Sequence, residues 1–400
     1  MAYRPLHDIR VLDLTNVLAG PFACHQLAHL GADVIKVEAR GTGDLARQLG
    51  ADPALNQRGM GASFLAQNAG KRSITIDLKQ PGGKAVFRRL VQQADVVVEN
   101  FRPGVMQRLG LGFEQLRIDN PRLVYCAISG FGQDGPLRDL PAYDQIVQGM
   151  SGAMSITGSP EAAPLRVGYP VADTIGGMTA SYAIAAALAD RQRTEACFID
   201  ISMLEAIMAT MGWAVSNYLV AGREARPLGN ENMTASPSGT FQTGAGLLNI
   251  AANRQTQFEA LCRVIGRPGL AQDARYAERE ARLRHRYELK ADIERALQAK
   301  SAEEWWPLLT AASVPAGPVY TVPQALAHPQ IAERGMVATF SNAPGVERDI
   351  SVLRTGIKLD GQAPAVDTPP PTLGQHTDAI LAELGYTAAE IAALKTEQAV

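Results

Sequence analysis

Cysteine is scarce in this sequence of 400 residues, and its four copies are scattered at Cys24, Cys126, Cys197 and Cys262. None of them forms a CxxC pair, so the pattern predicts reduced and mostly buried thiols in a cytoplasmic protein. An excess of charge is also missing, because the net charge is only -2 at pH 7. This balance gives no electrostatic reason to expect nucleic acid or an anionic membrane as a partner.

Long apolar runs are absent as well. No stretch reaches the roughly 18 to 20 residues that a membrane span requires, and the first residues, MAYRPLHDIRVLDL, lack the apolar core and cleavage site of a signal peptide. His25 and His29 are spaced i, i+4, but no pattern of further ligands accompanies them. We therefore interpret the two histidines as one face of a helix and expect no metal.

What is present is the ordinary balance of a globular protein, with 46% hydrophobic and 20% charged residues. The length predicts more than one domain. Glycine, proline, asparagine and serine cluster from Gly222 to Gly246 and mark a shift in composition. We expect a large domain over residues 1–215, completed by residues 330–400, and a smaller α+β domain with linkers over residues 216–329. Trp305 and Trp306 are expected to anchor the smaller core.

The N-terminal segment has the pattern of a βαβ unit. Ile9–Leu14 and Asp33–Glu38 read as strands, and Phe22–Leu30 between them reads as a helix that ends before Gly31. Such a unit predicts a parallel sheet with a right-handed crossover, and hence an α/β, Rossmann-like fold. The GxGxxG fingerprint is missing from the first turn, which argues against a dinucleotide and a dehydrogenase.

Several loops follow predicted strands and should gather at one edge of the sheet. They are Arg40–Asp44, Asn100–Gly104 and Gly130–Gly135. Basic residues recur in or near these loops, namely Arg40, Lys71, Arg72, Arg102 and Arg108. Their placement favours a large phosphorylated ligand over the alternative of separate solvated surface charges.

A single acid stands out in Leu165–Met178, the segment LRVGYPVADTIGGM. Tyr169–Ala172 reads as a short strand, and Asp173 then stands at the start of a helix rich in small residues. The N–H groups at a helix N-terminus stabilise negative charge, so Asp173 is a candidate for a reactive carboxylate. The alternative is a simple helix N-cap, a common position for aspartate.

Seven motifs, spread in order over nearly the full length, resemble the class III CoA-transferases, a group that includes formyl-CoA and carnitine CoA-transferases and the related α-methylacyl-CoA racemases. The motifs are VLDLTNVLAGP (Val11–Pro21), LGADVIKVE (Leu30–Glu38), GTGD (Gly41–Asp44), NAGKRSITIDLK (Asn68–Lys79), ADVVVENFRPGVMQRLG (Ala94–Gly110), GFGQDGP (Gly130–Pro136) and LGQHTD (Leu373–Asp378).

The resemblance implies that Asp173 is the nucleophile. In such enzymes the aspartate attacks an acyl-CoA thioester, and a mixed anhydride and an aspartyl-CoA thioester follow before a free carboxylic acid receives the CoA. Gly176 and Gly177 become expected oxyanion donors. Coenzyme A enters as the acyl-CoA substrate, with no metal. Its implied contacts are Val17, Leu18, Arg40, Ile76, Asp77, Leu78, Lys79, Asn100, Phe101, Arg102 and Arg108.

Substrate contacts are implied at Tyr143 and Asp144, and a helix cap is the alternative role of Asp144. Where racemases have a histidine before the acid and a Tyr–Glu pair, this chain has Tyr143–Asp144 and Phe241–Gln242. Tyrosine and glutamine do not exchange the α-proton at pH 7, so CoA transfer is favoured over racemisation.

Formyl-CoA transferase carries a glycine-rich loop where this chain has Asn230, Asn232, Thr234 and Ser236, so the resemblance does not support oxalate or formyl specificity, and these side chains suit a dicarboxylate or hydroxy-acid. We expect a succinyl-CoA-type donor with an acceptor such as itaconate, citramalate or mesaconate. The alternatives are an α-methylacyl-CoA racemase and a non-catalytic CoA-binding protein. The family further implies an interlocked homodimer.

Overall fold

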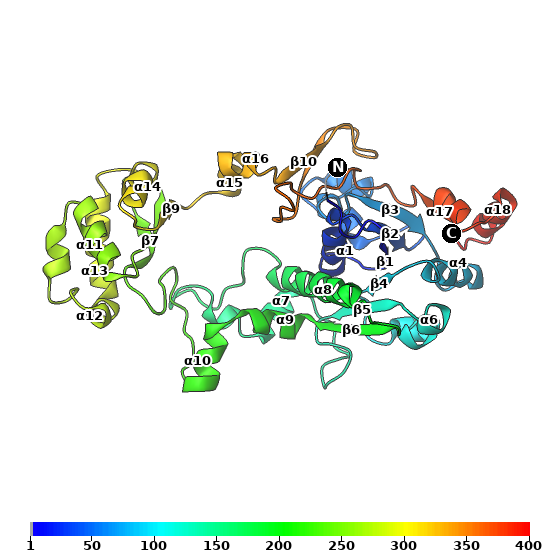
Figure 1. Cartoon of the computed structure of the whole chain (residues 1–400), viewed down its shortest axis with the longest axis horizontal. Helices are drawn as coiled ribbons and strands as arrows, with labels where there is room; N and C mark the ends of the chain where they lie inside the picture. Colours follow the sequence, from blue (N-terminus) through cyan, green and yellow to red (C-terminus); the bar gives the residue numbers. More distant parts are fainter. Residues whose placement is uncertain (1–2) are drawn as a thin grey trace. The chain divides into compact units, whose positions relative to one another are not determined.

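The computed structural model describes residues 3–400, which divide into two compact units (Figure 1). Unit 1 contains the chain up to Ala153, then Arg166–Ala221 and Pro329–Val400. Unit 2 contains Met154–Leu165 and Gly222–His328. The segment Met154–Leu165 therefore groups with unit 2, although we had placed it in the larger domain.

Unit 1 is built on a six-stranded parallel sheet with strand order β3-β2-β1-β4-β5-β6. The strands are β1 (Arg10–Asp13), β2 (Asp33–Glu38), β3 (Lys71–Thr75), β4 (Val96–Glu99), β5 (Val124–Ser129) and β6 (Cys197–Ser202). This order is the doubly wound one, in which the chain reverses direction across the sheet between β1 and β4. The predicted α/β fold with a parallel sheet is confirmed.

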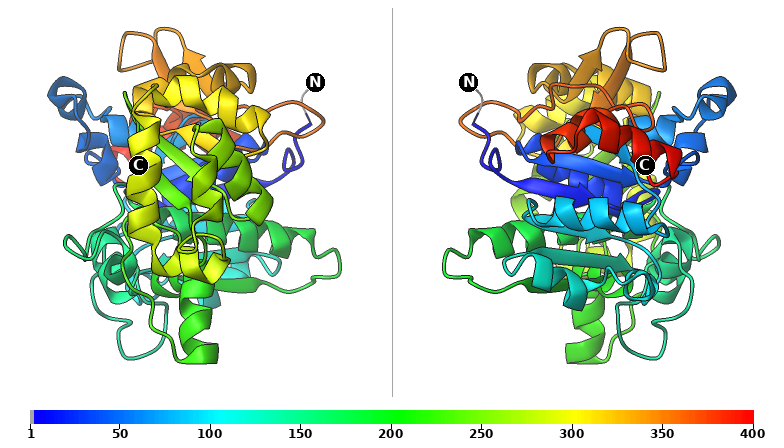
Figure 2. Two further views of the ribbon diagram at one scale, coloured as in Figure 1. Left: turned by 90° about the vertical axis from the view of Figure 1, so that its left-hand side faces the viewer. Right: turned by 90° about the vertical axis from the view of Figure 1, so that its right-hand side faces the viewer.

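Successive residues of each strand pack on opposite faces of the sheet. On β1, Val11 joins the core under α1 (Ala19–His29) and α8 (Val171–Ala189), whereas Leu12 joins the opposite core. That second core is covered by α4 (Pro81–Val91), α6 (Phe113–Asp119), α17 (Thr377–Glu383) and α18 (Ala388–Thr396). Figure 2 shows α17 and α18, in red, beside the blue N-terminal strands. The chain's last helices thus cover one face of the N-terminal sheet.

The remaining elements of unit 1 connect or flank these layers. They are η1 (Leu45–Gln48), α2 (Pro53–Gln57), α3 (Ala62–Leu65), α5 (Val105–Leu109), α7 (Asp144–Met150), α9 (Met203–Thr210), α10 (Trp213–Ala221), α16 (Pro329–Glu333), β10 (Val337–Phe340) and β11 (Ile350–Leu353). The strand expected at Tyr169–Ala172 is wrong, because α8 already begins at Val171.

Helix α8 is the one described helix that has the length and mean hydropathy of a membrane span. A core helix meets the same criterion, and α8 packs on α1, α9 and the sheet of unit 1. One face of α8 therefore belongs to the protein core, although only 33% of its apolar window is buried, and composition alone is weak evidence for a span.

Unit 2 has a three-stranded antiparallel sheet in the order β7-β8-β9. Its elements are η2 (Met154–Ile156), β7 (Ser238–Gln242), β8 (Leu247–Ala251), α11 (Gln255–Val264), η3 (Pro268–Gln272), α12 (Arg279–Arg284), α13 (Arg286–Leu297), α14 (Ala302–Ala311), β9 (Ala316–Pro318) and α15 (Val322–Ala327). Trp305 is buried in the core of this unit and donates a hydrogen bond from Nε1 to the Leu297 carbonyl at 2.8 Å. The structure confirms the predicted anchoring role of Trp305.

Candidate active site

Asp173 occupies the third position of α8 and lines a cavity of about 290 Å³ in unit 1. The structure brings predicted residues from three other segments to the same cavity. They are Val17, Leu18, Asn100, Phe101 and Tyr143. Asn16, Ser129 and Met203 also line it. We did not single these out, although Asn16 directly precedes the predicted pair Val17–Leu18.

The N-cap interpretation of Asp173 is wrong. The N-cap residue of α8 is Pro170, and Asp173 lies inside the first helical turn. Burial, and then the charge of the Asp144 carboxylate, raise the pKa of Asp173 to about 7. Such a carboxylate is held in a poorly solvated site, which is where nucleophilic and acid–base groups are commonly found.

Asp144 begins α7 and is itself buried, so its carboxylate is hidden from the cavity. Its Oδ1 accepts hydrogen bonds from the backbone N–H groups of Ala172 at 2.8 Å and Asp173 at 3.3 Å. Its Oδ2 accepts a bond of 2.6 Å from Gln148 Nε2. Asp144 therefore caps the helix that carries Asp173, rather than its own helix. Tyr143, by contrast, is 70% exposed and reaches the cavity.

Gly176 and Gly177 contribute to helix packing and do not line the cavity. They lie inside α8, beyond the first turn, where the helix itself uses the backbone N–H groups. A Cβ at Gly176 would lie 2.8 Å from Met203 Cγ, and one at Gly177 would lie 2.4 Å from the Ala19 carbonyl oxygen. The expectation that they donate to an oxyanion is thus contradicted, and their small size serves close helix packing.

The N-terminus of α1 lies where the glycines were expected to act. Leu18 and Ala19 line the cavity beside Asp173, and no side chain caps this helix end. Its first N–H groups have no acceptor within the helix. They are suited to stabilise negative charge that develops next to Asp173.

A second cavity of about 510 Å³ adjoins the first, and Asn16 and Phe101 line both. It lies where β1, β2, β3 and β4 end, at the reversal point of the sheet. Predicted CoA contacts line this cavity, namely Arg40, Ile76, Asp77, Leu78, Lys79, Phe101 and Arg108. Its basic side chains suit phosphates, and its apolar ones suit an adenine ring or an alkyl chain.

Two further predicted residues do not line either cavity. Arg102 is exposed and is not among the residues that line either cavity. Gln242 ends β7 in unit 2, where its backbone N–H donates to Glu294 Oε1 at 2.9 Å. Among residues 3–400, no group of three or more histidine, cysteine or acidic side chains has the arrangement of a metal site.

Comparison with known proteins identifies the family. Residues 6–377 match the family model for CoA-transferase family III. The chain is 41% identical over 387 residues to a succinate–glutarate CoA-transferase of Agrobacterium fabrum, covering 95% of this chain and 96% of the relative. It is 42% identical over 335 residues to an acetyl-CoA:oxalate CoA-transferase of Acetobacter aceti, covering 83% and 85% of the two chains.

A solved structure agrees with the sequence matches. The crystal structure of a CaiB/BaiF family protein from Brucella suis superposes with a TM-score of 0.83 at 36% identity, over 95% of this chain and 99% of that one. The fold, the site at the reversal point of the sheet and these matches lead to one conclusion: the chain belongs to CoA-transferase family III and is an enzyme of that class.

Proposed function

We propose that this enzyme transfers CoA from succinyl-CoA to a small dicarboxylic acid, with Asp173 as the covalent nucleophile. The observation that carries the proposal is the position of Asp173, a largely buried carboxylate in a small cavity that adjoins a larger basic and apolar one. A CoA moiety bound in the larger cavity would bring its thioester past Asn16 and Phe101 to Asp173.

The proposed reaction has four steps. The Asp173 carboxylate attacks the thioester carbonyl, and the C–S bond breaks to give an aspartyl mixed anhydride and CoA thiolate. The thiolate attacks the Asp173 carbonyl carbon and releases the donor acid as its carboxylate. The acceptor carboxylate then attacks the aspartyl-CoA thioester and releases thiolate again. The thiolate finally attacks the acceptor carbonyl, which regenerates Asp173 and gives the new acyl-CoA without net proton transfer.

Each attack places negative charge on a carbonyl oxygen next to Asp173. The uncapped start of α1 at Leu18 and Ala19 lines this space and offers backbone N–H groups to that oxygen. Asn16, Asn100 and Ser129 add neutral polar groups to the wall. In the larger cavity, Arg40, Lys79 and Arg108 would bind the CoA phosphates.

We infer the class of acceptor acid from the size and polarity of the smaller cavity. Its volume of about 290 Å³ suits a short acid. The amide and hydroxyl groups in its wall suit a second carboxylate. Glutarate and oxalate occur in the names of the relatives. We therefore extend the expected acceptors from itaconate, citramalate and mesaconate to include glutarate.

Mass spectrometry of the protein mixed with succinyl-CoA tests the mechanism. We expect a covalent CoA adduct that maps to Asp173, together with transfer of CoA to at least one acid of a panel of short dicarboxylates. D173A should abolish the adduct and the transfer, while D8A, which removes an aspartate that is 84% exposed, should retain both. An adduct on another residue, or turnover only of long branched acyl-CoA, would refute the proposal.

A further inference from the structure

The turn between β1 and α1 forms the wall shared by the two cavities. Thr15 and Asn16 line the larger cavity, and Asn16, Val17 and Leu18 line the smaller one. Val17 has a φ of 67°. A β-branched residue rarely adopts this left-handed conformation, so surrounding contacts must hold it in place.

Two buried charges provide these contacts, although neither lines a cavity. Asp44 Oδ1 accepts a hydrogen bond of 2.9 Å from the Val17 N–H. Lys36 Nζ donates to the Thr15 carbonyl at 2.9 Å and forms an ion pair of 2.9 Å with Asp44 Oδ2. Both side chains are completely buried. The Lys36–Asp44 ion pair thus holds the turn at Thr15 and at Val17, the residues on either side of Asn16.

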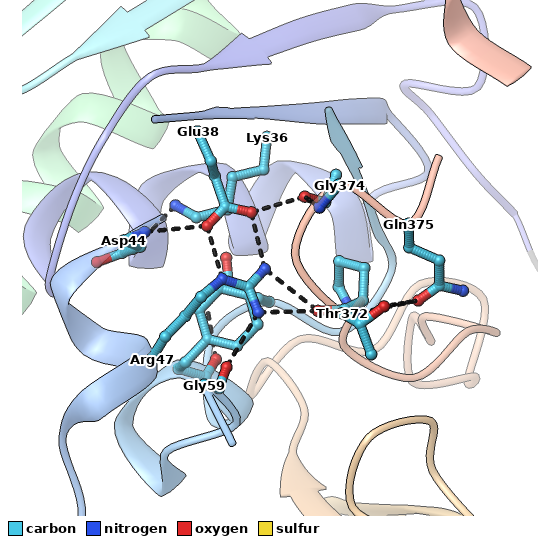
Figure 3. Close-up of polar contacts among 12 residues, drawn as sticks. Lys36, Glu38, Asp44, Arg47, Gly59, Thr372, Gly374 and Gln375 are labelled. Atoms are coloured by element: carbon cyan, nitrogen blue, oxygen red, sulfur yellow. Dashed lines mark hydrogen bonds and ion pairs between the residues drawn. The ribbon is translucent and has the colours of Figure 1, made fainter. Parts of the chain in front are cut away.

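Asp44 is in turn held by a second buried ion pair (Figure 3). The Asp44 N–H donates to Glu38 Oε1 at 3.0 Å, and Arg47 binds Glu38 through two N–H···O bonds of 2.7 Å. Arg47 also donates to the Pro371 carbonyl at 3.2 Å. Ser73 Oγ donates to Glu38 Oε2 at 2.7 Å. The position of Asp44 is therefore fixed from β2, β3 and the segment before α17.

Asn100 adds a third constraint on the same turn, and it is a cavity residue. Its Oδ1 accepts from the Asn16 N–H at 2.8 Å, and its Nδ2 donates to the Asn16 carbonyl at 2.9 Å. Thr15, Asn16 and Val17 thus each have a backbone group bound by a distant side chain. Nothing in the local sequence would keep Val17 at a positive φ without them.

Burial by itself would lower the pKa of Lys36, but the carboxylates of Asp13 and Asp44 more than offset it and raise the pKa above its ordinary value. Lys71 Nζ, 2.8 Å from Asp13 Oδ2, also faces this cluster. Lys36 therefore stays charged and keeps its ion pair across the working pH range.

We propose that Lys36 and Asp44 are positioning residues for CoA transfer. They fix the strained Val17 and the adjoining start of α1 against Asp173, and they touch neither substrate. This inference rests on the proposed function. It predicts that loss of the Asp44 acceptor affects the chemical step more than acyl-CoA binding, because Val17 relaxes and moves Leu18 and Ala19 relative to Asp173.

The test compares three variants in steady-state CoA transfer and in single-turnover adduct formation on Asp173, at a temperature where circular dichroism shows each to be folded. D44A should lower kcat at least tenfold and change KM for the acyl-CoA less than threefold. D44N retains an acceptor oxygen for Val17 but loses the ion pair with Lys36, so its kcat should lie between those of wild type and D44A. D44A/V17G should recover at least tenfold over D44A, because glycine adopts a positive φ without strain.

A folded D44A with wild-type kcat, or a D44A/V17G double variant no better than D44A, would overturn the inference. If D44A does not fold, K36M decides, since it removes the bond to Thr15 and should also lower kcat at least tenfold. A K36M variant within twofold of wild type then contradicts the proposal. Absence of the Asp173 adduct in the wild-type protein would instead count against the proposed function itself.

Discussion

At the scale of single residues, the site depends on two carboxylates whose roles differ because their surroundings differ. Asp144 accepts three hydrogen bonds, two from backbone N–H groups and one from Gln148. Asp173 faces the cavity, and its own backbone N–H is bound by Asp144. One acid thus stays in place as a cap, while the other is left poorly solvated at the cavity.

The raised pKa of Asp173 predicts the pH dependence of the reaction. Only the ionised carboxylate attacks a thioester, and its pKa is about 7. The value of kcat/KM should therefore rise with pH through about 7, and at pH 5 it should be about a hundredth of its plateau. A pH profile of the adduct-forming step measures this directly.

The D144N variant tests whether the charge of Asp144 contributes to this pH profile. Because a neutral amide no longer repels the Asp173 carboxylate, the acid limb should move to lower pH in D144N, while D8N should reproduce the wild-type profile. An acid limb that stays in place in D144N would show that the Asp144 charge has no influence on Asp173.

At the scale of elements, the site is the meeting point of two helices that begin at the same cavity. Helix α8 approaches α1 closely because Gly177 has no side chain in front of the Ala19 carbonyl. Helix packing therefore sets the distance between Asp173 and the N-terminus of α1.

G177A tests that contact. The new Cβ would lie 2.4 Å from the Ala19 oxygen and 3.0 Å from Phe22 Cδ1, so the helices must separate. We expect a loss of about 1–3 kcal/mol in the free energy of unfolding, as is usual for overpacking. Thermal unfolding measures the loss, and kcat should fall with it. G168A has open space around its Cβ and should change stability by less than about 0.5 kcal/mol.

At the scale of the whole molecule, we propose that unit 1 takes part in a homodimer, because several of its large apolar side chains are exposed. On α10, the one buried residue is Ala214, and the exposed fractions of Leu219 and Val220 are 75% and 87%. Tyr182 on α8 is 76% exposed. Exposed apolar patches of this kind mark interfaces between proteins. They support the homodimer that the family resemblance implies, in which a second copy covers α8 and α10.

Sedimentation velocity tests the proposed dimer. The wild-type protein should sediment as a species with twice the 42.7 kDa mass of one chain. L219E/V220E should dissociate it, because two charges would be desolvated in the interface. I118E carries the same change at an isolated position that is 75% exposed and should leave the dimer intact. A wild-type monomer at micromolar concentration would contradict the proposal.

The parallel strands of unit 1 could be predicted from local sequence, since short apolar runs separated by turns and helices encode that pattern. The sequence also singled out Asp173, through its position before a run of small residues and through the family motifs. It misjudged the local structure around that residue, because the apolar run Tyr169–Ala172 fits a strand as well as the start of a buried helix.

The action of distant residues on the site could not be predicted in this way, because it depends on how the chain folds in three dimensions. Asp144 caps α8 from 29 positions away, and Asp44 binds Val17 from 27 positions away. These bonds depend on the register of the strands and on how the helices lie on the sheet, which local periodicity does not specify. The packing role of Gly177 also depends on the tertiary structure, because it arises from the Ala19 carbonyl that lies against this glycine.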